Sequence, residues 1–271
     1  MYKSSMIHNM IGPIVNHLQI REIFHLEFLR WFGRKLEPNH YALKGGVNLR
    51  LFFKSIRYSE DMDIDIKGAR VERIKKTVMD ILAARGFTDS LKSFGIERII
   101  APDMAKAKQT ETTQRFKIHL LTTGGEDLFT KVEFSRRGFK DSPFVEPVSH
   151  EILRAYKMAP LLVSHYGVVS ALAQKIQALA QRTVLQARDI FDLFVLSSQH
   201  EASKRNTIAV GRKILKIAQD NIFLVKFPQF RDTVVAYLGA EDQKAYSSPD
   251  VWDEIKLKTS HFLEEFSHED K

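Results

Sequence analysis

The sequence has no cysteine among its 271 residues. This absence excludes disulfide bonds, thiolate metal ligands and cysteine nucleophiles. There is also no run of about 18 apolar residues, the length that a membrane-spanning helix needs, and no apolar stretch of a signal peptide near residue 1. With 44% hydrophobic and 27% charged residues, the chain has enough apolar surface to form a core. We therefore expect a cytoplasmic globular protein without a membrane partner.

Acidic residues are in the minority. Asp and Glu together number 33 against 41 Lys and Arg, which gives a formal net charge of +8 at pH 7. A basic surface favours polyanionic partners because each contact with a phosphate releases condensed counterions. Many soluble proteins are mildly basic without such a partner, so the charge leaves nucleic-acid or nucleotide binding as one of two open interpretations.

Internal repeats are absent as well, and two patterns follow one another along the chain. Gly86 is expected to end a helix over 70–85, and from about residue 167 the pattern is helical almost to the end. The order predicts an α+β fold, with a mixed sheet and flanking helices over residues 1–150 and a helical lobe over 151–271. The other elements expected are helices over 5–33 (with a break at Gly12-Pro13) and from 47, and strands over 41–43, 61–66, 96–100, 114–121 and 128–135.

Acidic and apolar residues alternate strictly from Asp61 to Ile66. Since the side chains of a strand point to its two faces in turn, Asp61, Asp63 and Asp65 are expected on one face, each about 6–7 Å from the next. Carboxylates at that spacing repel one another unless a cation lies between them, and Mg²⁺ prefers carboxylate oxygens together with substrate phosphates. The strand therefore indicates a metal site for phosphoryl or nucleotidyl transfer, or else an acidic face that is only solvated.

A diglycine turn, Lys44-Gly45-Gly46, lies between the short strand over 41–43 and the helix that follows it. Backbone N–H groups and a helix N-terminus at such a turn can hold phosphate groups. Gly-Gly is also common in ordinary turns, and the spacing is neither that of a Walker A loop nor that of a dinucleotide-binding fingerprint. The stronger signal is the combination of strand, diglycine turn and helix with an Asp-x-Asp strand after it.

The helical half has one lysine on a face that also carries apolar residues. Lys175 shares this face with Leu179 and, two turns on, with Arg182. A lysine in this position either extends its ammonium group to solvent or points it at an anion in a cleft. Asp189 and Asp192 lie one turn apart on the next expected helix, where both could form structural ion pairs with Lys175, and Asp192 is expected to remain structural.

Taken together, these segments resemble a known superfamily. Gly45-Gly46 followed by Arg-Tyr-Ser-Glu-Asp-Met-Asp over 57–63 is similar to the pattern of nucleotidyltransferases. With Lys-Gly-Gly-Val-Asn-Leu-Arg over 44–50, the chain looks like the AbiEii/AbiGii nucleotidyltransferase-like toxins, which include the MenT-type toxins. A helix lysine followed by Arg-Asp-x-x-Asp-Leu, within 173–193, resembles their second signature. The resemblance covers about residues 40–196, and Gln174 stands where many relatives have an acidic residue.

The resemblance implies a set of site residues. Asp61 and Asp63 would be catalytic and would bind Mg²⁺ together with a third carboxylate on a neighbouring strand, here Glu133. Lys175 would contact the triphosphate of an NTP, and Asp189 would orient Lys175 or activate the acceptor hydroxyl group. The residues expected to bind the nucleotide are Lys44, Gly45, Gly46, Arg57, Ser59 and Lys175.

The resemblance also implies a function. These toxins are halves of bacterial toxin–antitoxin or phage-defence pairs, so we expect a Mg²⁺-dependent transfer of a nucleoside monophosphate from an NTP to the 3′ end of tRNA, and an antitoxin as partner. Two alternatives stay open. A small-molecule nucleotidyltransferase that modifies antibiotics would share the acidic strand and the glycine turn, and a non-catalytic nucleotide-binding or protein-interaction module could use the same fold.

Overall fold

The computed structural model describes residues 15–136, 138–139, 142–203 and 210–268. The expected break at Gly12-Pro13 lies outside these residues. The first helix, α1 (His17–Gly33), begins at a side-chain cap, because Asn16 Oδ1 accepts hydrogen bonds from the backbone N–H groups of Leu18 and Gln19, both at 3.0 Å. This cap fixes the start of the helix by giving partners to two N–H groups that have none within it.

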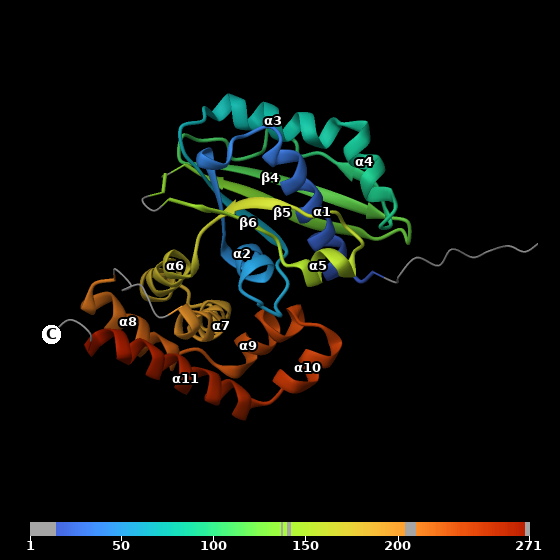
Figure 1. Cartoon of the computed structure of the whole chain (residues 1–271). Helices are drawn as coiled ribbons and strands as arrows, with labels where there is room; N and C mark the ends of the chain where they lie inside the picture. The colour runs from blue at the N-terminus through green and yellow to red at the C-terminus, as the bar shows by residue number, and fades with distance from the viewer. Residues whose placement is uncertain (1–14, 137, 140–141, 204–209, 269–271) are drawn as a thin grey trace, which may run out of the picture.

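A seven-stranded mixed sheet forms the centre of the first part of the chain (Figure 1). The strand order is β3-β4-β5-β2-β1-β7-β6, and only the pairs β2–β5 and β1–β7 are parallel. The five strands expected from the sequence are all present, and the acidic strand β2 lies inside the sheet. The strands are β1 (Tyr41–Lys44), β2 (Asp61–Ile66), β3 (Ile96–Ile100), β4 (Thr113–Thr122), β5 (Asp127–Ser135), β6 (Phe144–Pro147) and β7 (Leu162–His165).

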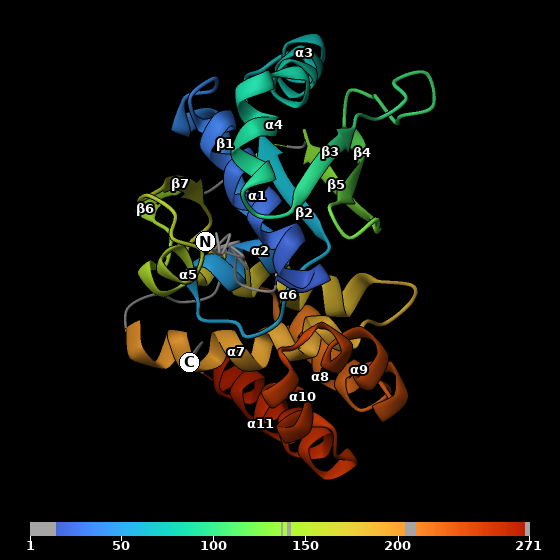
Figure 2. The same cartoon turned by 90° about the vertical axis from the view of Figure 1, so that its right-hand side faces the viewer.

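Apolar side chains gather on one face of this sheet. Met62 and Ile64 of β2, Phe116 of β4 and Phe134 of β5 are fully buried there. The helices that pack over this face are α1, α3 (Val71–Ala83) and α4 (Arg85–Lys92), and Figure 2 shows no labelled helix over the other face of β3, β4 and β5. Because side chains alternate along a strand, the residues between the buried ones point to that uncovered face.

The helix expected over 70–85 is present as α3, and a second helix that was not expected, α4, follows it directly. The backbone of Ala84 is extended, with φ −71° and ψ 122°, so α3 ends at Ala83 and α4 begins at Arg85. The prediction that Gly86 ends the first helix was wrong, because Gly86 lies within α4. Phe87 and Leu91, one turn apart, are fully buried, and the burial of these two side chains stabilises the second helix.

The sheet continues beyond residue 150. After β6, the short helix α5 (His150–Ala155) leads to β7, which pairs with β6 and, through His165, with Leu43 of β1. Apart from Leu49, the clustered buried apolar side chains as far as Val163 belong to the core of the sheet, whereas those from Ala171 onward belong to a second core. We therefore propose that the chain divides near residue 166, later than the boundary expected between residues 150 and 151.

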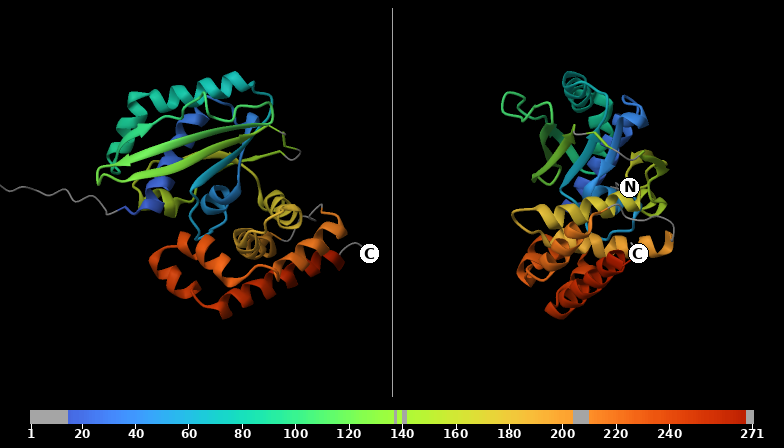
Figure 3. Two further views of the ribbon diagram at one scale, coloured as in Figure 1. Left: turned by 180° about the vertical axis from the view of Figure 1, so that it is seen from behind. Right: turned by 90° about the vertical axis from the view of Figure 1, so that its left-hand side faces the viewer.

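The second core lies within a helical lobe on the other side of the sheet from α3 and α4 (Figure 3). One helix belongs to both parts: α2 (Gly45–Phe52) contributes Val47 and Leu51 to the core of the sheet and Leu49 to that of the lobe. The predicted α+β layout, a mixed sheet followed by a helical lobe, is confirmed. The helices of the lobe are α6 (Val168–Gln181), α7 (Ala187–Ser203), α8 (Arg212–Ile222), α9 (Phe227–Thr233), α10 (Ala240–Tyr246) and α11 (Pro249–His268).

No helix within the described ranges is both long and apolar enough to cross a membrane.

Candidate active site

A polar cavity of about 370 Å³ opens where the sheet meets the helical lobe. Its wall is built from the diglycine turn, the loop before β2, the strands β2 and β5, the region of α6 and α7, and the segment from the end of α9 to Tyr237. Lys44 and Asp189 are not part of the wall. The expected site residues that line it are Gly45, Gly46, Arg57, Ser59, Asp61, Asp63, Glu133 and Lys175.

The acidic strand presents two of its three carboxylates to this cavity. Asp61 and Asp63 are in the wall, whereas Asp65 is buried beside it. Asp65 accepts hydrogen bonds from Lys44 Nζ at 2.5 Å and from the Tyr166 hydroxyl group at 2.7 Å. The ammonium group of Lys44, which was expected to bind the nucleotide, is therefore held at Asp65.

The parallel pairing of β2 with β5 brings the third expected carboxylate beside the other two. Glu133 lies opposite Asp63 in the register, and Lys131 lies opposite Asp61. Glu133 Oε2 accepts a hydrogen bond from Arg115 Nε at 2.6 Å and lies 3.8 Å from Lys131 Nζ, which in turn is 2.9 Å from Asp61 Oδ2. Glu133 is thus already engaged by cationic side chains of the chain itself.

The surroundings of the Asp63 carboxyl group favour its neutral form. Burial raises the pKa of Asp63, and the negative charges of Glu133 and Asp61 add to this effect, while Lys44 and Lys131 oppose it. The two lysines do not outweigh burial and the neighbouring carboxylates, and a divalent cation would add the further positive charge that favours the ionised form of Asp63.

The carboxylates of the cavity suit a metal ion that is also bound by a substrate. Among the described residues, no group of three or more His, Cys, Asp or Glu side chains is placed to hold a metal ion by itself. Mg²⁺ in nucleotide sites is commonly held by one or two carboxylates together with substrate phosphates. Asp61 and Asp63 fit that mode of binding, in which the nucleotide completes the coordination.

The glycines of the turn are required by the atoms that lie against them. Gly45 has φ +70°, and a Cβ atom there would lie 2.9 Å from Asp63 Oδ2. A Cβ atom at Gly46 would overlap Ser59 Oγ and lie 2.8 Å from Arg57 Nη2. Since α2 begins at Gly45, the N–H groups of its first turn, which have no partner within the helix, lie at the cavity wall where they suit an anion.

A buried lysine forms the opposite side of the cavity. Lys175 Nζ lies 3.0 Å from Asp189 Oδ1 and 2.6 Å from Asp192 Oδ2, and both carboxylates are fully buried. Burial alone would lower the pKa of Lys175, but the negative charges of Asp192 and Asp189 outweigh it and raise the pKa. Lys175 is therefore charged, and the two aspartates of α7 hold it in place.

Two arginines complete this ion network, the buried Arg57 and the partly exposed Arg182. Arg57 Nη2 donates hydrogen bonds to both oxygens of Asp192, at 2.9 and 3.1 Å. Arg182 Nε lies 2.8 Å from Asp189 Oδ2, an ion pair without an aligned hydrogen bond. Burial alone would raise the pKa of Asp192, but Arg57 and Lys175 lower it. Because Arg57 precedes β2 and Asp192 lies on α7, the network joins the sheet to the lobe.

Part of the cavity wall was not anticipated from the sequence. Lys131 stands two residues before Glu133, so the period of a strand would have placed both on one face. Tyr237 belongs to a segment without any motif, and it is brought to the site by a backbone hydrogen bond of 2.9 Å from Tyr58 N to Tyr237 O. The residues of the wall that were missed are Glu60, Lys131, Arg182, Gln186, Arg188, Asp232, Thr233 and Tyr237.

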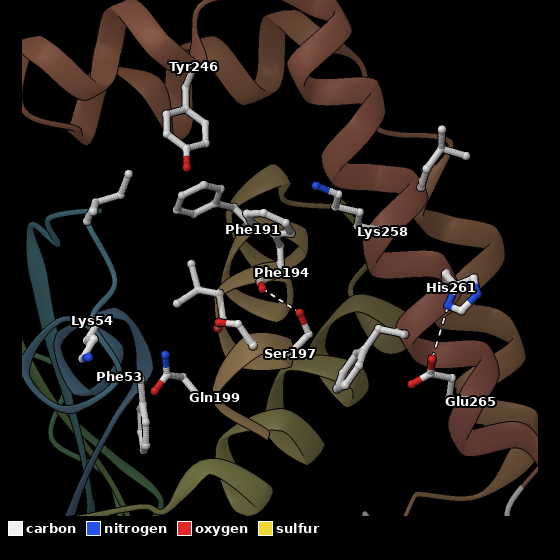
Figure 4. A pocket seen from close by; sticks show the side chains of 15 residues that line it. Phe53, Lys54, Phe191, Phe194, Ser197, Gln199, Tyr246, Lys258, His261 and Glu265 are labelled. Carbon is white, nitrogen blue, oxygen red and sulfur yellow. Dashed lines mark hydrogen bonds and ion pairs between the residues drawn. The ribbon is translucent and has the colours of Figure 1, made fainter. Parts of the chain in front are cut away.

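A larger cavity of about 750 Å³ lies between α7, α11 and the loop after α2 (Figure 4). Its wall is mainly apolar and includes Phe53, Phe191 and Phe194, with Lys258 and His261 of α11 across from them. It contains no residue that the sequence predicted for the site, and no pair of carboxylates. The smaller polar cavity is therefore the candidate active site, because it has the acidic pair that metal-assisted phosphate chemistry needs.

Comparisons with known proteins find relatives of the whole chain. The sequence profile of the AbiEii family, nucleotidyl transferase toxins of type IV toxin–antitoxin systems, matches residues 27–262. No curated protein sequence matches the chain. The MenT4 nucleotidyltransferase toxin from Mycobacterium tuberculosis H37Rv has a TM-score of 0.59 at 16% identity, over 94% of this chain and 85% of that one. JHP933 from Helicobacter pylori has a TM-score of 0.51 at 18% identity, over 90% and 91%. At such identities, the two structures show a shared fold.

Replacing Asp192 by Asn should lower the free energy of unfolding at pH 7 by about 3–5 kcal/mol, because Lys175 and Arg57 would stay buried beside one negative charge fewer. The folded-state pKa of Asp192 lies below that of an unfolded aspartate. The contribution of ionised Asp192 to the free energy of unfolding is therefore complete above about pH 4 and is lost as the pH falls further.

Urea denaturation of Asp192→Asn and the wild type between pH 7 and pH 3 measures this effect, and the difference between the two proteins should shrink at the acid end. Asp220→Asn, which removes an exposed ion pair with Lys216, is the control and should change stability by less than about 1 kcal/mol. A difference for Asp192→Asn that does not vary with pH would contradict the ion network as described.

Replacing Gly46 by Ala should weaken NTP binding at least about tenfold, or 1.4 kcal/mol, because the added methyl group displaces Ser59 and Arg57 from the cavity wall. Calorimetric titration with a non-hydrolysable NTP measures the affinity. Gly211→Ala is the matched control, since a Cβ atom there would meet no atom within 4 Å. Equal affinities of the two variants would show that the turn does not hold phosphate.

Proposed function

The chain belongs to the AbiEii family of nucleotidyl transferase toxins from type IV toxin–antitoxin systems, and on that basis we propose that it transfers a nucleoside monophosphate from an NTP to the 3′ end of tRNA, with Mg²⁺ as its metal ion. One observation carries the proposal. A single cavity places Asp61 and Asp63 of the sheet across from Lys175 of the lobe, with the diglycine turn beside them. Carboxylates for a metal, N–H groups for phosphate and a fixed cation are the parts that nucleotidyl transfer needs.

The proposed reaction is a displacement at the α-phosphate. The oxygen of the acceptor hydroxyl group bonds to the α-phosphorus, and the bond from this phosphorus to the oxygen that bridges it to the β-phosphate breaks. Pyrophosphate leaves with that electron pair, and the hydroxyl proton passes to solvent. A divalent ion held at Asp61 and Asp63 would neutralise phosphate charge and polarise the reacting phosphate.

The side chains of the cavity would position the nucleotide for this reaction. The first N–H groups of α2 at Gly45 and Gly46 suit the phosphates, and Arg57 beside them adds a fixed positive charge. Lys175 is proposed to contact the triphosphate from the side of the lobe. Asp189 lies behind Lys175, 3.0 Å from its ammonium group and outside the wall, which supports an orienting role for Asp189 over activation of the acceptor.

The uncovered face of β3, β4 and β5 supports RNA as the acceptor. This face carries Arg98, Lys117 and Lys131, together with the exposed ring of Phe129. Lys117 lies directly opposite Lys131 in the antiparallel pair β4–β5, and because Lys131 is already paired with Asp61, the exposed ammonium group of Lys117 is the one of the two that suits a phosphate of a polyanion. Lys131 also lines the cavity, so the basic face leads into the site. A small-molecule nucleotidyltransferase needs no such surface.

Membership of a type IV toxin family implies a cognate antitoxin. We propose that this antitoxin neutralises the protein in the cytoplasm, where a tRNA acceptor would be found.

Incubation of the protein with tRNA, Mg²⁺ and each α-³²P-labelled NTP in turn tests the proposal. Label should appear at the 3′ end of the RNA, and Asp63→Asn should reduce incorporation by at least about 100-fold because one of two metal-binding carboxylates is lost. Asp80→Asn, at an exposed ion pair on α3, is the control and should retain full activity. Transfer to a small hydroxyl compound alone would support the small-molecule alternative, and NTP binding without transfer would support the non-catalytic module.

Reversing one charge on the uncovered face should separate RNA binding from nucleotide binding. Lys117→Glu should weaken tRNA binding about tenfold and lower the slope of log K against log salt concentration by about 1, while NTP affinity stays unchanged. Lys213→Glu changes the net charge equally at an exposed position of α8 and should leave both affinities unaltered. An equal loss of tRNA binding in the two variants would indicate that only the net charge matters.

A further inference from the structure

The ammonium group of Lys131 lies among the carboxylates of the cavity. Its Nζ atom is 2.9 Å from Asp61 Oδ2 and 3.8 Å from Glu133 Oε2. The pairing of β5 with β2 fixes this place, since Lys131 is the residue directly opposite Asp61 in the register. A positive charge that the chain itself supplies is therefore built into the acidic side of the site.

Glu133 is held by cationic groups on the same oxygen atom. Its Oε2 accepts the hydrogen bond from Arg115 Nε at 2.6 Å and is also the atom nearest to Lys131 Nζ. Arg115 lies directly opposite Glu133 in the antiparallel pair β4–β5, so this contact too follows from strand register. A metal ion bound through Oε2 of Glu133 would have to displace both side chains from that oxygen.

The net charge of the side chains at the acidic side of the cavity also favours a single metal ion. Asp61, Asp63 and Glu133 carry three negative charges, and Lys131 and Arg115 carry two positive ones, which leaves a net charge of −1. Without the two cations the same carboxylates would carry −3, enough to attract two divalent ions. A site with a single excess negative charge, and no group of three ligands among the described residues, suits one ion.

We propose that this active site takes one divalent cation, held by Asp61, Asp63 and the NTP phosphates, and that the ammonium group of Lys131 supplies the second positive charge. Glu133 and Arg115 are then positioning residues that hold Lys131 in place. This inference rests on the proposed function, because it concerns the ions that accompany the NTP in the same cavity.

A count of bound Mn²⁺ ions tests the inference without turnover. The full chain is saturated with an α,β-methylene NTP, and free Mn²⁺ is followed by electron paramagnetic resonance during a titration. The wild-type complex should bind one Mn²⁺ per chain. Lys131→Met should bind two, a doubling, because Asp61 Oδ2 loses its ammonium partner and the net charge of the cluster changes from −1 to −2 while Arg115 stays at Glu133.

Two further variants keep the result interpretable. Lys117→Met removes the same charge from the neighbouring strand, directly opposite Lys131, and should still bind one Mn²⁺. Lys131→Arg retains the positive charge and should also bind one. Circular dichroism confirms that each variant is folded before the titration.

The outcomes separate this inference from the proposed function. A wild-type complex with two Mn²⁺ ions, or a folded Lys131→Met variant that binds only one, overturns the role of Lys131. Nucleotide transfer to tRNA with two bound ions would keep the proposed function and reject this inference. One bound ion without any nucleotide transfer would support this inference and reject the proposed function.

Discussion

The buried ion network between the sheet and the lobe is the interaction on which the rest of the structure depends. Arg57 and Lys175 carry two positive charges at its buried centre and Asp189 and Asp192 two negative ones, and the partly exposed Arg182 adds one positive charge in excess. Charges can be buried only if they are paired at short range, and contacts of 2.6–3.0 Å join these. The two parts of the chain must therefore meet in one arrangement. The excess positive charge lies beside the cavity, where it attracts an anionic substrate.

The sheet separates packing from chemistry through the period of its strands. On β2, Met62 and Ile64 enter the core beneath α1, α3 and α4, while Asp61 and Asp63 enter the cavity. On β5, Val132 is buried in the core, and the neighbouring residue Lys131 points to the other face and lines the cavity. One residue of slippage between these strands would exchange the two sets. The large core on one face thus holds the register that the acidic and basic groups on the other face require.

The sequence alone was sufficient for features that depend on local period. Strict alternation located the face of Asp61, Asp63 and Asp65, and the turn residues located the strand–glycine–helix unit. It could not show that Asp65 is occupied by Lys44 and Tyr166, because the hydroxyl group comes from more than 100 residues away. For the same reason Asp192 looked like an ordinary helix aspartate, since its partner Arg57 lies 135 residues earlier in the chain.

Other features were missed because their patterns are weak. The strand β7 has only four residues and continues the sheet after a segment with no clear periodicity. The two-helix arrangement of α3 and α4 depends on the backbone of Ala84, which no residue preference predicts. Pairings between charges far apart in the sequence, and strands of only four residues, could therefore not be predicted from the residues. The position of the acidic strand could be.

Helix α2 has a mechanical consequence. Leu49 is packed in the core of the lobe while Val47 and Leu51, on the same two turns, are packed in the core of the sheet. Swinging the lobe away from the sheet would pull an apolar side chain out of one core or the other, at about 1.5–3 kcal/mol for a leucine, in addition to breaking the pairing of Arg57 with Asp192. Helix α2 and the Arg57–Asp192 ion pair therefore tie the two walls of the cavity together, and any separation of the lobe from the sheet must expose an apolar side chain as well as break that ion pair.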